Sequence, residues 1–329
     1  MQIKIEQVLN QKAKKVDFKI FEFIDKYISK GLRKPITYLF KSGGKRIRPS
    51  IAMLAAELIC SDADVALYPA VSCEIVHAAS LIYDDIIDRA TKRRHKKPIH
   101  LRWNYPTAIL AGNQLLSLAI KVLALDPKSK STSFSDNIDL FSNAWMAICD
   151  GKFLGAIGAF DRVTDEQVLD IIYKKTAVLF ELAAKTGAIY AGADRNAVNA
   201  LASYGKNVGM AFQIQDDILG ILGNEKVLGK DVGSDIKEGK KTLLVSYVLN
   251  NGSTSYKKKL LHYLGDPNLN KEDLELVNDI FVNSGGVDHA KNYAYKFSQD
   301  AISCLDVLED SKDKKYLAEI SQYVVERLK

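Results

Sequence analysis

Apolar side chains recur every three or four residues along most of the chain, a spacing typical of helices. Between residues 68 and 88 the positions that keep this spacing are Val71, Ile75, Ala78, Ile82 and Ile86. The segment 165–193 repeats it directly after Thr164, a residue type suited to capping a helix N-terminus. No run of β-branched residues lies between turns of the hairpin type. The pattern therefore predicts helices rather than strands.

Short polar stretches separate the apolar segments. They lie at residues 41–49, 126–137, 250–259 and 265–270, and no composition shift or repeat of fixed period divides the chain. Helices of average length joined by links this short would fill 329 residues. We therefore expect one all-α domain over residues 1–329, built as a bundle of roughly ten or more helices.

The composition is that of an ordinary globular protein, with 47% apolar and 26% charged residues. The longest apolar run, residues 107–125, is interrupted by Asn113, Gln114 and Lys121, so a buried helix is expected there rather than a membrane span. A net charge of +6 suits anionic ligands but does not by itself indicate nucleic acid. We expect neither a membrane span nor a nucleic-acid partner.

The cysteines lie far apart along the chain and form neither a CxxC motif nor a disulfide framework: Cys60, Cys73, Cys149 and Cys304. A reducing compartment suits this pattern. The N-terminal residues have no apolar core of the kind that signal peptides carry. These features predict a cytoplasmic location.

The stretch "HAASLIYDDIIDRATKRR", which begins at His77, combines a helical pattern with three aspartates. On a helix His77, Asp84 and Asp88 share one narrow face, with Asp85 beside it. Carboxylates four residues apart offer half of a site for a hard cation such as Mg²⁺, although a solvated helix end is the alternative. Cys73 and His77 would suit half of a zinc site, but the sequence supplies no second Cys/His pair.

A second pair of aspartates occurs in "FQIQDDILG", residues 212–220. On a helix Gln213, Asp216 and Asp217 share one face with Gly220. A helical bundle can direct two such acidic faces into one cavity. Two acidic pairs that face each other would repel unless divalent ions lay between them.

A loop rich in glycine and lysine follows, "GNEKVLGKDVGSDIKEGKKT". It does not match a P-loop, because five residues separate Gly233 from Gly239 and Lys241 stands where Ser or Thr should follow Lys240. Two interpretations remain open. The loop is either a solvated surface connection or a flap whose lysines, Lys230 and Lys240, close over phosphate oxygens.

Two basic stretches flank the first aspartates. "GGKRIRP" at 43–49 places Lys45, Arg46 and Arg48 after two glycines, which let a backbone approach an anion closely. "TKRRHKKPIHLR" at 91–102 would suit nucleic acid or acidic lipids, but few aromatic residues are interleaved with it. Either stretch alone would be read as a solvated surface. A carboxylate-bound metal combined with several Lys and Arg side chains fits a diphosphate best.

In this order the motifs resemble those of the trans-isoprenyl diphosphate synthases, the family of farnesyl and geranylgeranyl diphosphate synthases. The shared features are "GGKRIRP", "DDIID" followed by "RR", "KT" at 175–176, "FQIQDD", and a Gly/Lys loop ending in "GKKTL". The "DDILG" form of the second motif looks most like archaeal members, such as their geranylgeranyl diphosphate synthases. The resemblance implies an all-α bundle around a deep central cavity, usually a homodimer.

The resemblance also implies roles for individual residues. Those that look like ligands of several Mg²⁺ ions, for which Mn²⁺ can substitute, are Asp84, Asp88 and Asp216. Those that match contacts of the allylic diphosphate are Arg93, Lys175, Lys230 and Lys240, helped by Thr176 and Gln213. Those that match the pocket for isopentenyl diphosphate are Lys45, Arg48, His77 and Arg94. Three more residues belong to the same motifs and are expected in the site: Arg46, Asp85 and Asp217.

The implied reaction is the Mg²⁺-dependent, head-to-tail condensation of isopentenyl diphosphate with an allylic prenyl diphosphate. Metal ions and fixed cations stabilise the charge that develops on the departing diphosphate. The sequence shows no dedicated base, in agreement with the family view that the released diphosphate takes up the proton.

Product length is expected to depend on side chains that precede the first aspartate. Ala79 and Ser80 are both small, so neither blocks a growing chain, and Val76 and Cys73 are the next candidates for a cavity floor. Each added isoprene unit gains on the order of 4 kcal/mol by burial. We expect a C20 product, geranylgeranyl diphosphate, with a C25–C30 polyprenyl diphosphate as the alternative.

Four residues depart from the family pattern. Gly220 stands where many relatives have a third Asp, His95 replaces a Gly, Asn113 replaces an Asp, and Lys152 stands where a Gln is common. Archaeal relatives share Gly220, but the other three departures leave open a non-catalytic or regulatory subunit that binds prenyl diphosphates within a hetero-oligomeric synthase. A terpene cyclase is a further rival, but it would not need a basic pocket for a second diphosphate.

Overall fold

The computed structural model describes residues 2–127, 134–157, 163–223 and 232–326. Helices account for most of this part of the chain. Its only β-type contact is an isolated bridge between Arg93 and Lys96. The prediction of an all-α fold is confirmed.

The helices follow one another with short links. The first half of the chain contains α1 (Gln2–Tyr27), α2 (Lys30–Phe40), α3 (Ile47–Cys60), η1 (Ala63–Ala66), α4 (Leu67–Ile87), α5 (Ile99–Arg102), α6 (Tyr105–Ala124) and α7 (Phe134–Ile157). The second half contains α8 (Asp165–Ile172), η2 (Tyr173–Ala177), α9 (Val178–Tyr190), α10 (Arg195–Leu222), α12 (Ser234–Lys237), α13 (Leu243–Asn251), α14 (Thr254–Tyr263), α15 (Lys271–Asn283), α16 (Gly286–Cys304) and α17 (Lys312–Val325).

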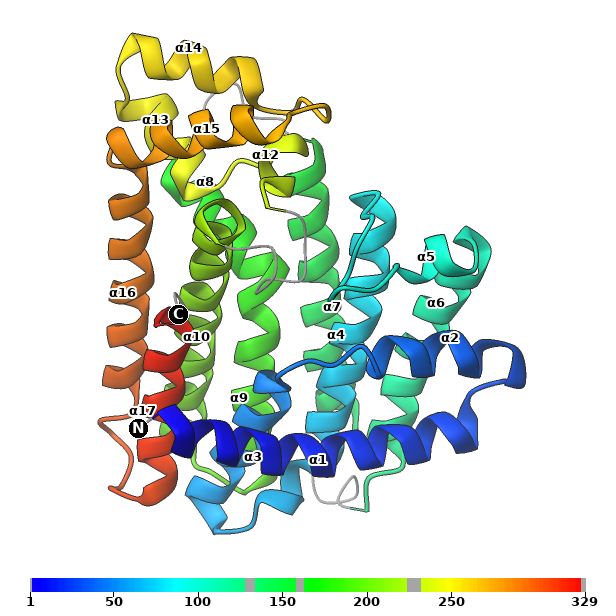
Figure 1. Cartoon of the computed structure of the whole chain (residues 1–329). Helices are drawn as coiled ribbons and strands as arrows, with labels where there is room; N and C mark the ends of the chain where they lie inside the picture. Colours follow the sequence, from blue (N-terminus) through cyan, green and yellow to red (C-terminus); the bar gives the residue numbers. More distant parts are fainter. Residues whose placement is uncertain (1, 128–133, 158–162, 224–231, 327–329) are drawn as a thin grey trace.

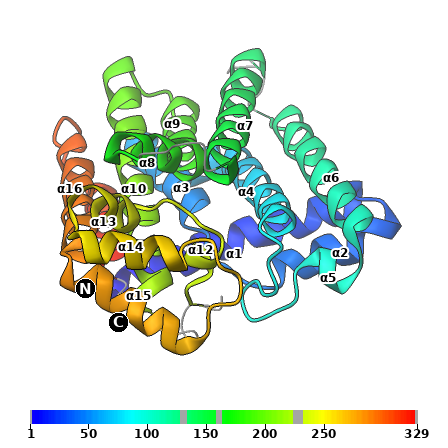
Figure 2. The same ribbon diagram turned by 90° about the horizontal axis from the view of Figure 1, so that it is seen from above.

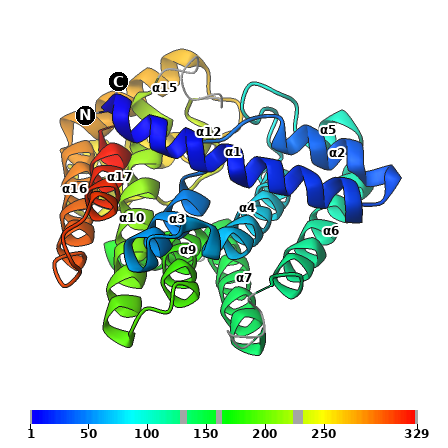
Figure 3. The same ribbon diagram turned by 90° about the horizontal axis from the view of Figure 1, so that it is seen from below.

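The long helices α4, α7, α9, α10 and α16 run side by side, and α1 crosses beneath them (Figures 1 and 3). The most extensive helix contacts join α4 to α6 and α10 to both α9 and α16. The short helices α12 to α15 cover one end of the bundle, which Figure 2 shows from above. The C-terminal ends of α4 and α10, which carry the two aspartate motifs, both lie at this covered end (Figure 1).

Polar side chains begin several helices where the sequence places them. Thr164 forms a capping box with Gln167 at the start of α8, as its position predicts. Asp194 accepts a hydrogen bond from a backbone N–H in the first turn of α10. Such caps satisfy N–H groups that a first turn leaves unpaired. The helix that carries the second aspartate pair therefore begins at a defined residue.

In the part of the chain that the structure describes, two helices are apolar and long enough to span a membrane by length and composition alone. The first, Ala63–Ile87, is 78% buried inside the protein over its most apolar window, so core packing explains its composition. The second is α6, which is only 44% buried and exposes Ile109, Leu110 and Ile120. The expectation of a buried helix at 107–125 is therefore right for one face of α6 and wrong for the other.

Candidate active site

The first aspartate motif lies where α4 ends. Asp84 and Asp85 belong to the helix, whereas Asp88 is its C-cap. The buried carboxylate of Asp85 accepts two hydrogen bonds from Arg93, with Oδ1 2.8 Å from Nε and 2.6 Å from Nη2. Burial raises the pKa of Asp85, although Arg93 opposes this shift. Asp85 therefore holds Arg93 in place and does not line the cavity described below.

Lys152 of α7 lies between the other two carboxylates of this motif. Its Nζ is 3.0 Å from Oδ1 of Asp84 and 2.6 Å from Oδ1 of Asp88. Burial alone would raise the pKa of Asp84, but Lys175 and Lys152 together lower it. Both carboxylates therefore have an ammonium partner supplied by the protein itself.

A second lysine reaches the motif from the segment after α12. Lys240 Nζ is 3.6 Å from Oδ2 of Asp88, 2.9 Å from Oδ1 of Asp235 and 2.6 Å from Oε2 of Glu238. Burial would lower the pKa of Lys240, yet these carboxylates outweigh it and raise the pKa. The lysine is held in its charged form at the cavity wall.

The segment η2 is a π-helical turn, a geometry found often at functional sites. It carries Lys175 and Thr176, and the hydroxyl of Thr176 donates a 2.7 Å hydrogen bond to Oε1 of Gln213. Gln213 in turn donates a 2.7 Å hydrogen bond to Oδ1 of Asp217. This chain of hydrogen bonds links η2 to the second aspartate motif on α10.

Close packing of α7 against η2 sets the position of Lys175. A Cβ added to Gly151 would lie only 2.7 Å from the backbone nitrogen of Lys175, so only glycine allows this approach. Burial lowers the pKa of Lys175, and the attraction of Asp84 only partly offsets this effect. Lys175 lies beside the first motif, and an added negative charge would stabilise its ammonium form.

A cavity of about 380 Å³ opens beside these groups. Its polar wall is formed by Asp88, Lys152, Lys175, Gln213, Asp217 and Lys240. Its apolar wall is formed by Ile87, Leu154, Val163, Val168, Ile171 and Ile172. Charged groups from α4, α7, η2 and α10 thus share one cavity with apolar side chains from α7 and α8.

The structure separates the members of the second motif. Asp217 lines the cavity, whereas Asp216 is partly buried and does not line it. Asp217, rather than the expected metal ligand Asp216, therefore faces this cavity. The predicted contact Lys230 lies outside the described residues.

A second group of basic residues, from 43–49 and Arg94, lies around His77, two turns before Asp84 on α4. Arg48 Nη1 is 3.3 Å from His77 Nε2, so the imidazole accepts from the guanidinium. Arg94 donates to the carbonyl oxygen of Gly43. A Cβ on Gly44 would meet Nη1 of Arg46 at 2.6 Å, so this glycine lets the guanidinium groups come together.

Burial and mutual repulsion lower the pKa values of His77 and Arg94. Burial, followed by repulsion from Arg48 and Arg94, lowers the pKa of His77 well below its ordinary value. Burial also lowers the pKa of Arg94, to about 10, and Arg46 adds to this effect despite the attraction of Glu74. We call the cluster of Arg48, His77 and Arg94 the basic pocket. An anion bound there would be attracted by both arginines.

Two other residues of "GGKRIRP" are held by the protein itself. Arg46 is buried and bonded to Asp17 at 2.8 Å and to Glu74 at 3.0 Å. Lys45 donates a 2.6 Å hydrogen bond to the hydroxyl of Tyr323 on α17. Arg46 therefore organises the turn, and Lys45 marks the edge of the basic pocket nearest α17.

The residues expected to set product length lie deeper along α4. Ala79, Val76 and Cys73 are buried, and the hydroxyl of Ser80 donates to the carbonyl oxygen of His77 at 2.8 Å. None of the four lines the 380 Å³ cavity, which extends towards α7 and α8 instead.

Burial raises the pKa of the Cys73 thiol to about 12. Within the described residues no three His, Cys, Asp or Glu side chains are grouped to hold a metal, so a zinc site at Cys73 and His77 gains no support.

The carboxylates of the first motif suit a Mg²⁺ ion that is held jointly by the protein and a substrate, rather than one enclosed by protein ligands alone. Mg²⁺ prefers oxygen donors and is usually bound by one or two carboxylates, with waters and substrate phosphates completing its shell. Asp84 and Asp88 offer such a pair. Asp88 and Asp217 line the cavity, whereas Asp84 does not. The residues therefore fit Mg²⁺ that binds together with a diphosphate.

Sequence reasoning missed several partners of the site. Asp235 and Glu238 hold Lys240, and their acidic side chains within a lysine-rich loop were the available signal. Tyr83 donates to Asn113 between α4 and α6, which gives this departure from the family pattern a structural partner. Tyr323 comes from the far end of the chain, and no local pattern pointed to it.

Comparisons with known proteins match most of the chain. The polyprenyl synthetase family model matches residues 29–281. A short chain isoprenyl diphosphate synthase of Methanothermobacter thermautotrophicus is 36% identical over 329 residues, covering 99% of each chain. A geranylgeranyl diphosphate synthase of Saccharolobus solfataricus is 36% identical over 326 residues, covering 97% of each chain. The crystal structure of geranylgeranyl pyrophosphate synthetase from Pyrococcus horikoshii shares the fold with a TM-score of 0.90, 34% identity and 99% coverage of both chains.

The similarity is not confined to the motifs, because it extends over nearly the full length of both relatives. The family match includes both aspartate motifs, η2 and the lysine-rich segment that follows α10. The chain belongs to the polyprenyl synthetase family and is a prenyltransferase, as its motifs predict.

Proposed function

We propose that the chain elongates prenyl chains by condensing isopentenyl diphosphate head-to-tail with an allylic diphosphate, in the presence of Mg²⁺. The observation that carries this proposal is the presence of two different anion sites along one helix. At the end of α4, Asp84 and Asp88 face the cavity lysines, whereas His77 belongs to the basic pocket. Seven residues, about 10 Å of helix, separate His77 from Asp84. This spacing suits two diphosphates whose hydrocarbon parts must meet.

Each anion site has a different chemical task. Bound Mg²⁺ would neutralise charge on the diphosphate that departs from the allylic carbon. Lys175 and Lys240 line the same cavity and can donate to that diphosphate, while Asp85 keeps Arg93 beside it. Because these donors are already in place, little reorganisation accompanies the development of charge.

The basic pocket is proposed to hold isopentenyl diphosphate. Arg48 and Arg94 supply cationic donors. His77 stays neutral near pH 7, because burial and the neighbouring arginines lower its pKa. The attacking double bond is thereby held next to the cavity, and the proton that is lost leaves with the released diphosphate. A terpene cyclase would not need this second pocket.

We propose a C20 product. The Saccharolobus relative and the Pyrococcus structure carry the name of geranylgeranyl synthases. Ala79 and Ser80 place no bulky group on α4 close to Asp84, which supports extension beyond C15. A C25–C30 product remains the runner-up, because Val76 and Cys73 are also modest in size.

We also propose that the chain acts as one domain, in a homodimer, in the reducing cytoplasm. Exposed apolar side chains on α6 and α7, which are neighbours in Figure 2, support a covered face: Ile109, Leu110, Ile120, Met146 and Phe153. Large exposed apolar residues that gather on adjacent helices are typical of subunit interfaces. None of the four cysteines forms a disulfide, which is consistent with a reducing compartment.

A product assay tests the proposal. Purified protein is supplied with Mg²⁺, labelled isopentenyl diphosphate, and dimethylallyl, geranyl or farnesyl diphosphate as primer, and the products are sized as alcohols after phosphatase treatment. We expect a ladder that ends at C20. A ladder that ends at C25 or beyond would correct the product length. Failure to extend any primer would contradict the enzyme proposal and favour the regulatory subunit.

A further inference from the structure

The most unusual contact in the site is the position of Lys152. Its side chain is 11% exposed and bridges two carboxylates that are themselves only 22% and 18% exposed. The three atoms Asp84 Oδ1, Lys152 Nζ and Asp88 Oδ1 are joined by distances of 3.0 and 2.6 Å. An ammonium group therefore lies between the two carboxylates to which the proposed function assigns a divalent cation.

The backbone holds Lys152 in this place. Its neighbour Gly151 packs against η2 so closely that an added Cβ would lie 2.7 Å from the nitrogen of Lys175 and 2.8 Å from Cβ of Lys174. α7 is therefore fixed against η2 at the residue directly before Lys152. The bridge is thus set by helix packing and not by a freely placed surface side chain.

The other cation on Asp88 is not bound in the same way. Lys240 lies 3.6 Å from Asp88 but forms shorter contacts with Asp235 and Glu238, at 2.9 and 2.6 Å. It would keep two carboxylate partners if Asp88 turned to a metal ion. Among the described residues Lys152 forms ion pairs with Asp84 and Asp88 alone, so it is the group that competes for both motif aspartates.

We propose that Lys152 is a built-in cation of the Asp84–Asp88 pair, and that a divalent ion binds this pair only by displacing its ammonium group. This inference rests on the proposed function only for the assignment of the pair to Mg²⁺. In the empty protein the lysine offsets repulsion between the carboxylates, so metal alone binds weakly there. When a diphosphate and metal enter together, Lys152 is already at the cavity wall and can turn its ammonium group to a phosphate oxygen.

The test is a Mn²⁺ titration of the substrate-free protein, followed by the paramagnetic resonance signal of free Mn²⁺. Wild type is compared with Lys152→Gln and with Lys174→Gln as a matched control. Lys174 also forms an ion pair, at 2.7 Å with Asp170, but its side chain is 31% exposed, against 11% for Lys152. Both variants therefore lose one ion-paired lysine and the same net charge.

We expect Lys152→Gln to bind Mn²⁺ roughly tenfold or more tightly than wild type, because a positive charge within about 4 Å of the metal position has gone. Lys174→Gln should bind as wild type does. Adding Asp84→Asn to Lys152→Gln should abolish the gain, which would place the new affinity at this pair. Lys152→Arg, which keeps the charge, should bind weakly.

Thermal unfolding gives a second measurement. Added Mg²⁺ should raise the Tm of Lys152→Gln by several degrees more than that of wild type, since a ligand stabilises the state that binds it. If Lys152→Gln does not fold, Lys152→Met replaces it in both assays. Equal metal affinity in wild type and the neutral variant, or weaker affinity in the variant, would overturn the inference.

The outcome separates this inference from the proposed function. Tighter Mn²⁺ binding by Lys152→Gln with no primer extension by any form would uphold the built-in cation and contradict the synthase. Primer extension by wild type together with unchanged Mn²⁺ affinity in the variant would uphold the synthase and contradict the built-in cation.

Discussion

Two regions along α4 handle charge in opposite ways. We call the motif Asp84–Asp88 the acidic side and the surroundings of His77 the basic side. On the acidic side each carboxylate of the first motif already has a cationic partner, Lys152 for Asp84 and Asp88, and Arg93 for Asp85. On the basic side the nearby carboxylates of Asp17 and Glu74 are both bound by the buried Arg46. Both carboxylates are therefore paired with Arg46 rather than with an arginine of the basic pocket.

The difference predicts two modes of binding on one helix. The acidic side is neutralised by the protein and has to exchange partners when its ligand arrives. The basic pocket is destabilised by burial and then by its own charges, which together lower the pKa of Arg94, and it gains directly from an added anion. A diphosphate should therefore bind the basic pocket without metal, whereas its binding at the acidic side should depend on metal.

The largest effect should follow from breaking the acidic side. Asp88→Asn removes a carboxylate shared by Lys152 and Lys240 and a proposed ligand of Mg²⁺. We expect kcat to fall about a thousandfold, because stabilisation of the departing diphosphate is lost. The KM for isopentenyl diphosphate should change less than about threefold, since the basic pocket is intact. Steady-state kinetics measures both values, and a loss of less than tenfold would contradict the assigned role.

The packing of α7 against η2 gives the next largest effect. Gly151→Ala should lower the free energy of unfolding by about 1–3 kcal/mol, because the new methyl group overlaps the backbone of Lys175. Gly155→Ala on the same helix is the control, since its Cβ would meet nothing closer than 3.7 Å. Urea unfolding should show a stability of Gly155→Ala equal to or above that of wild type. Equal losses in both variants would mean that helix flexibility, and not the close approach, matters.

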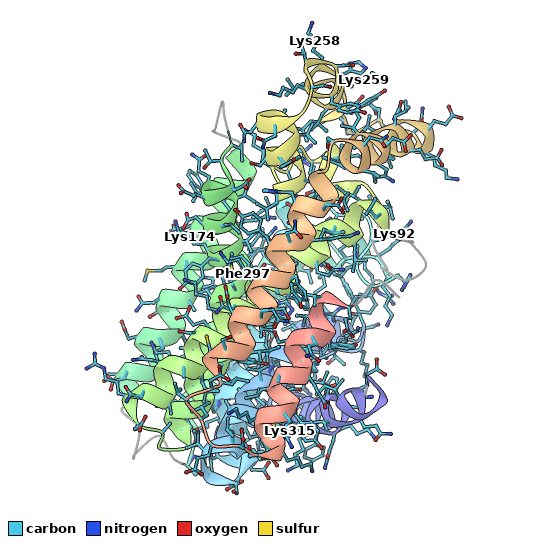
Figure 4. All side chains as sticks on the ribbon, turned by 90° about the vertical axis from the view of Figure 1, so that its left-hand side faces the viewer. Lys92, Lys174, Lys258, Lys259, Phe297 and Lys315 are labelled. Carbon is cyan, nitrogen blue, oxygen red and sulfur yellow. The ribbon has the colours of Figure 1, made fainter. Side chains whose placement is uncertain are left out.

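Breaking the basic pocket should act on one substrate only. Arg94→Met should raise the KM for isopentenyl diphosphate about 10- to 100-fold, with a smaller effect on the allylic substrate, because a charged donor to one diphosphate is lost. Lys92→Met is the control, because this nearby lysine is exposed (Figure 4). A rise in both KM values would show that Arg94 serves the two sites together.

The basic pocket should also make the fold sensitive to acid. The pKa of His77 is lowered in the folded protein, so the unfolded chain takes up a proton first as the pH falls. The stability that neutral His77 contributes is present above about pH 6.5 and is lost below it. Unfolding measured from pH 7.5 to 5 should show His77→Gln losing stability less steeply than wild type, by up to about 1.4 kcal/mol per pH unit. Parallel slopes would exclude His77 as the source.

The smallest effect concerns the turn beside the basic pocket. Arg94 and His95 have φ values of 51° and 61°, and the bridge between Arg93 and Lys96 closes the turn around them. A non-glycine residue is strained in this region, so His95→Gly should stabilise the protein by about 1 kcal/mol. Urea unfolding measures the gain. A loss of stability would mean that the His95 side chain, although exposed, makes a useful contact.

Local patterns predicted the helices better than their surroundings. The spacing of apolar residues over 68–88 and the cap at Thr164 both reappear in the structure, because they depend on neighbours along the chain. The same reasoning failed for α6, since a helix pattern does not show whether a second face is covered. The π-helical turn at η2 was not predicted, because it departs from the period on which the prediction relied.

The site could be predicted as a set of residues but not as a set of contacts. The helical positions correctly placed Asp85 beside the stripe of Asp84 and Asp88, and in the structure it turns away to Arg93. The bridge made by Lys152 depends on how α7 lies against η2, which no local pattern records. The sequence marked Lys152 as a departure, and only the fold shows where its charge lies.

One contact also bears on how the protein is made. The hydrogen bond from Lys45 to Tyr323 joins residues 278 positions apart, and α1 and α17 lie against each other in space. The two aspartate motifs and η2 are all translated before α17, but the edge of the basic pocket is completed only when α17 packs into place. A nascent chain therefore acquires its acidic side first, and the second substrate finds a finished pocket only after α17 has been made.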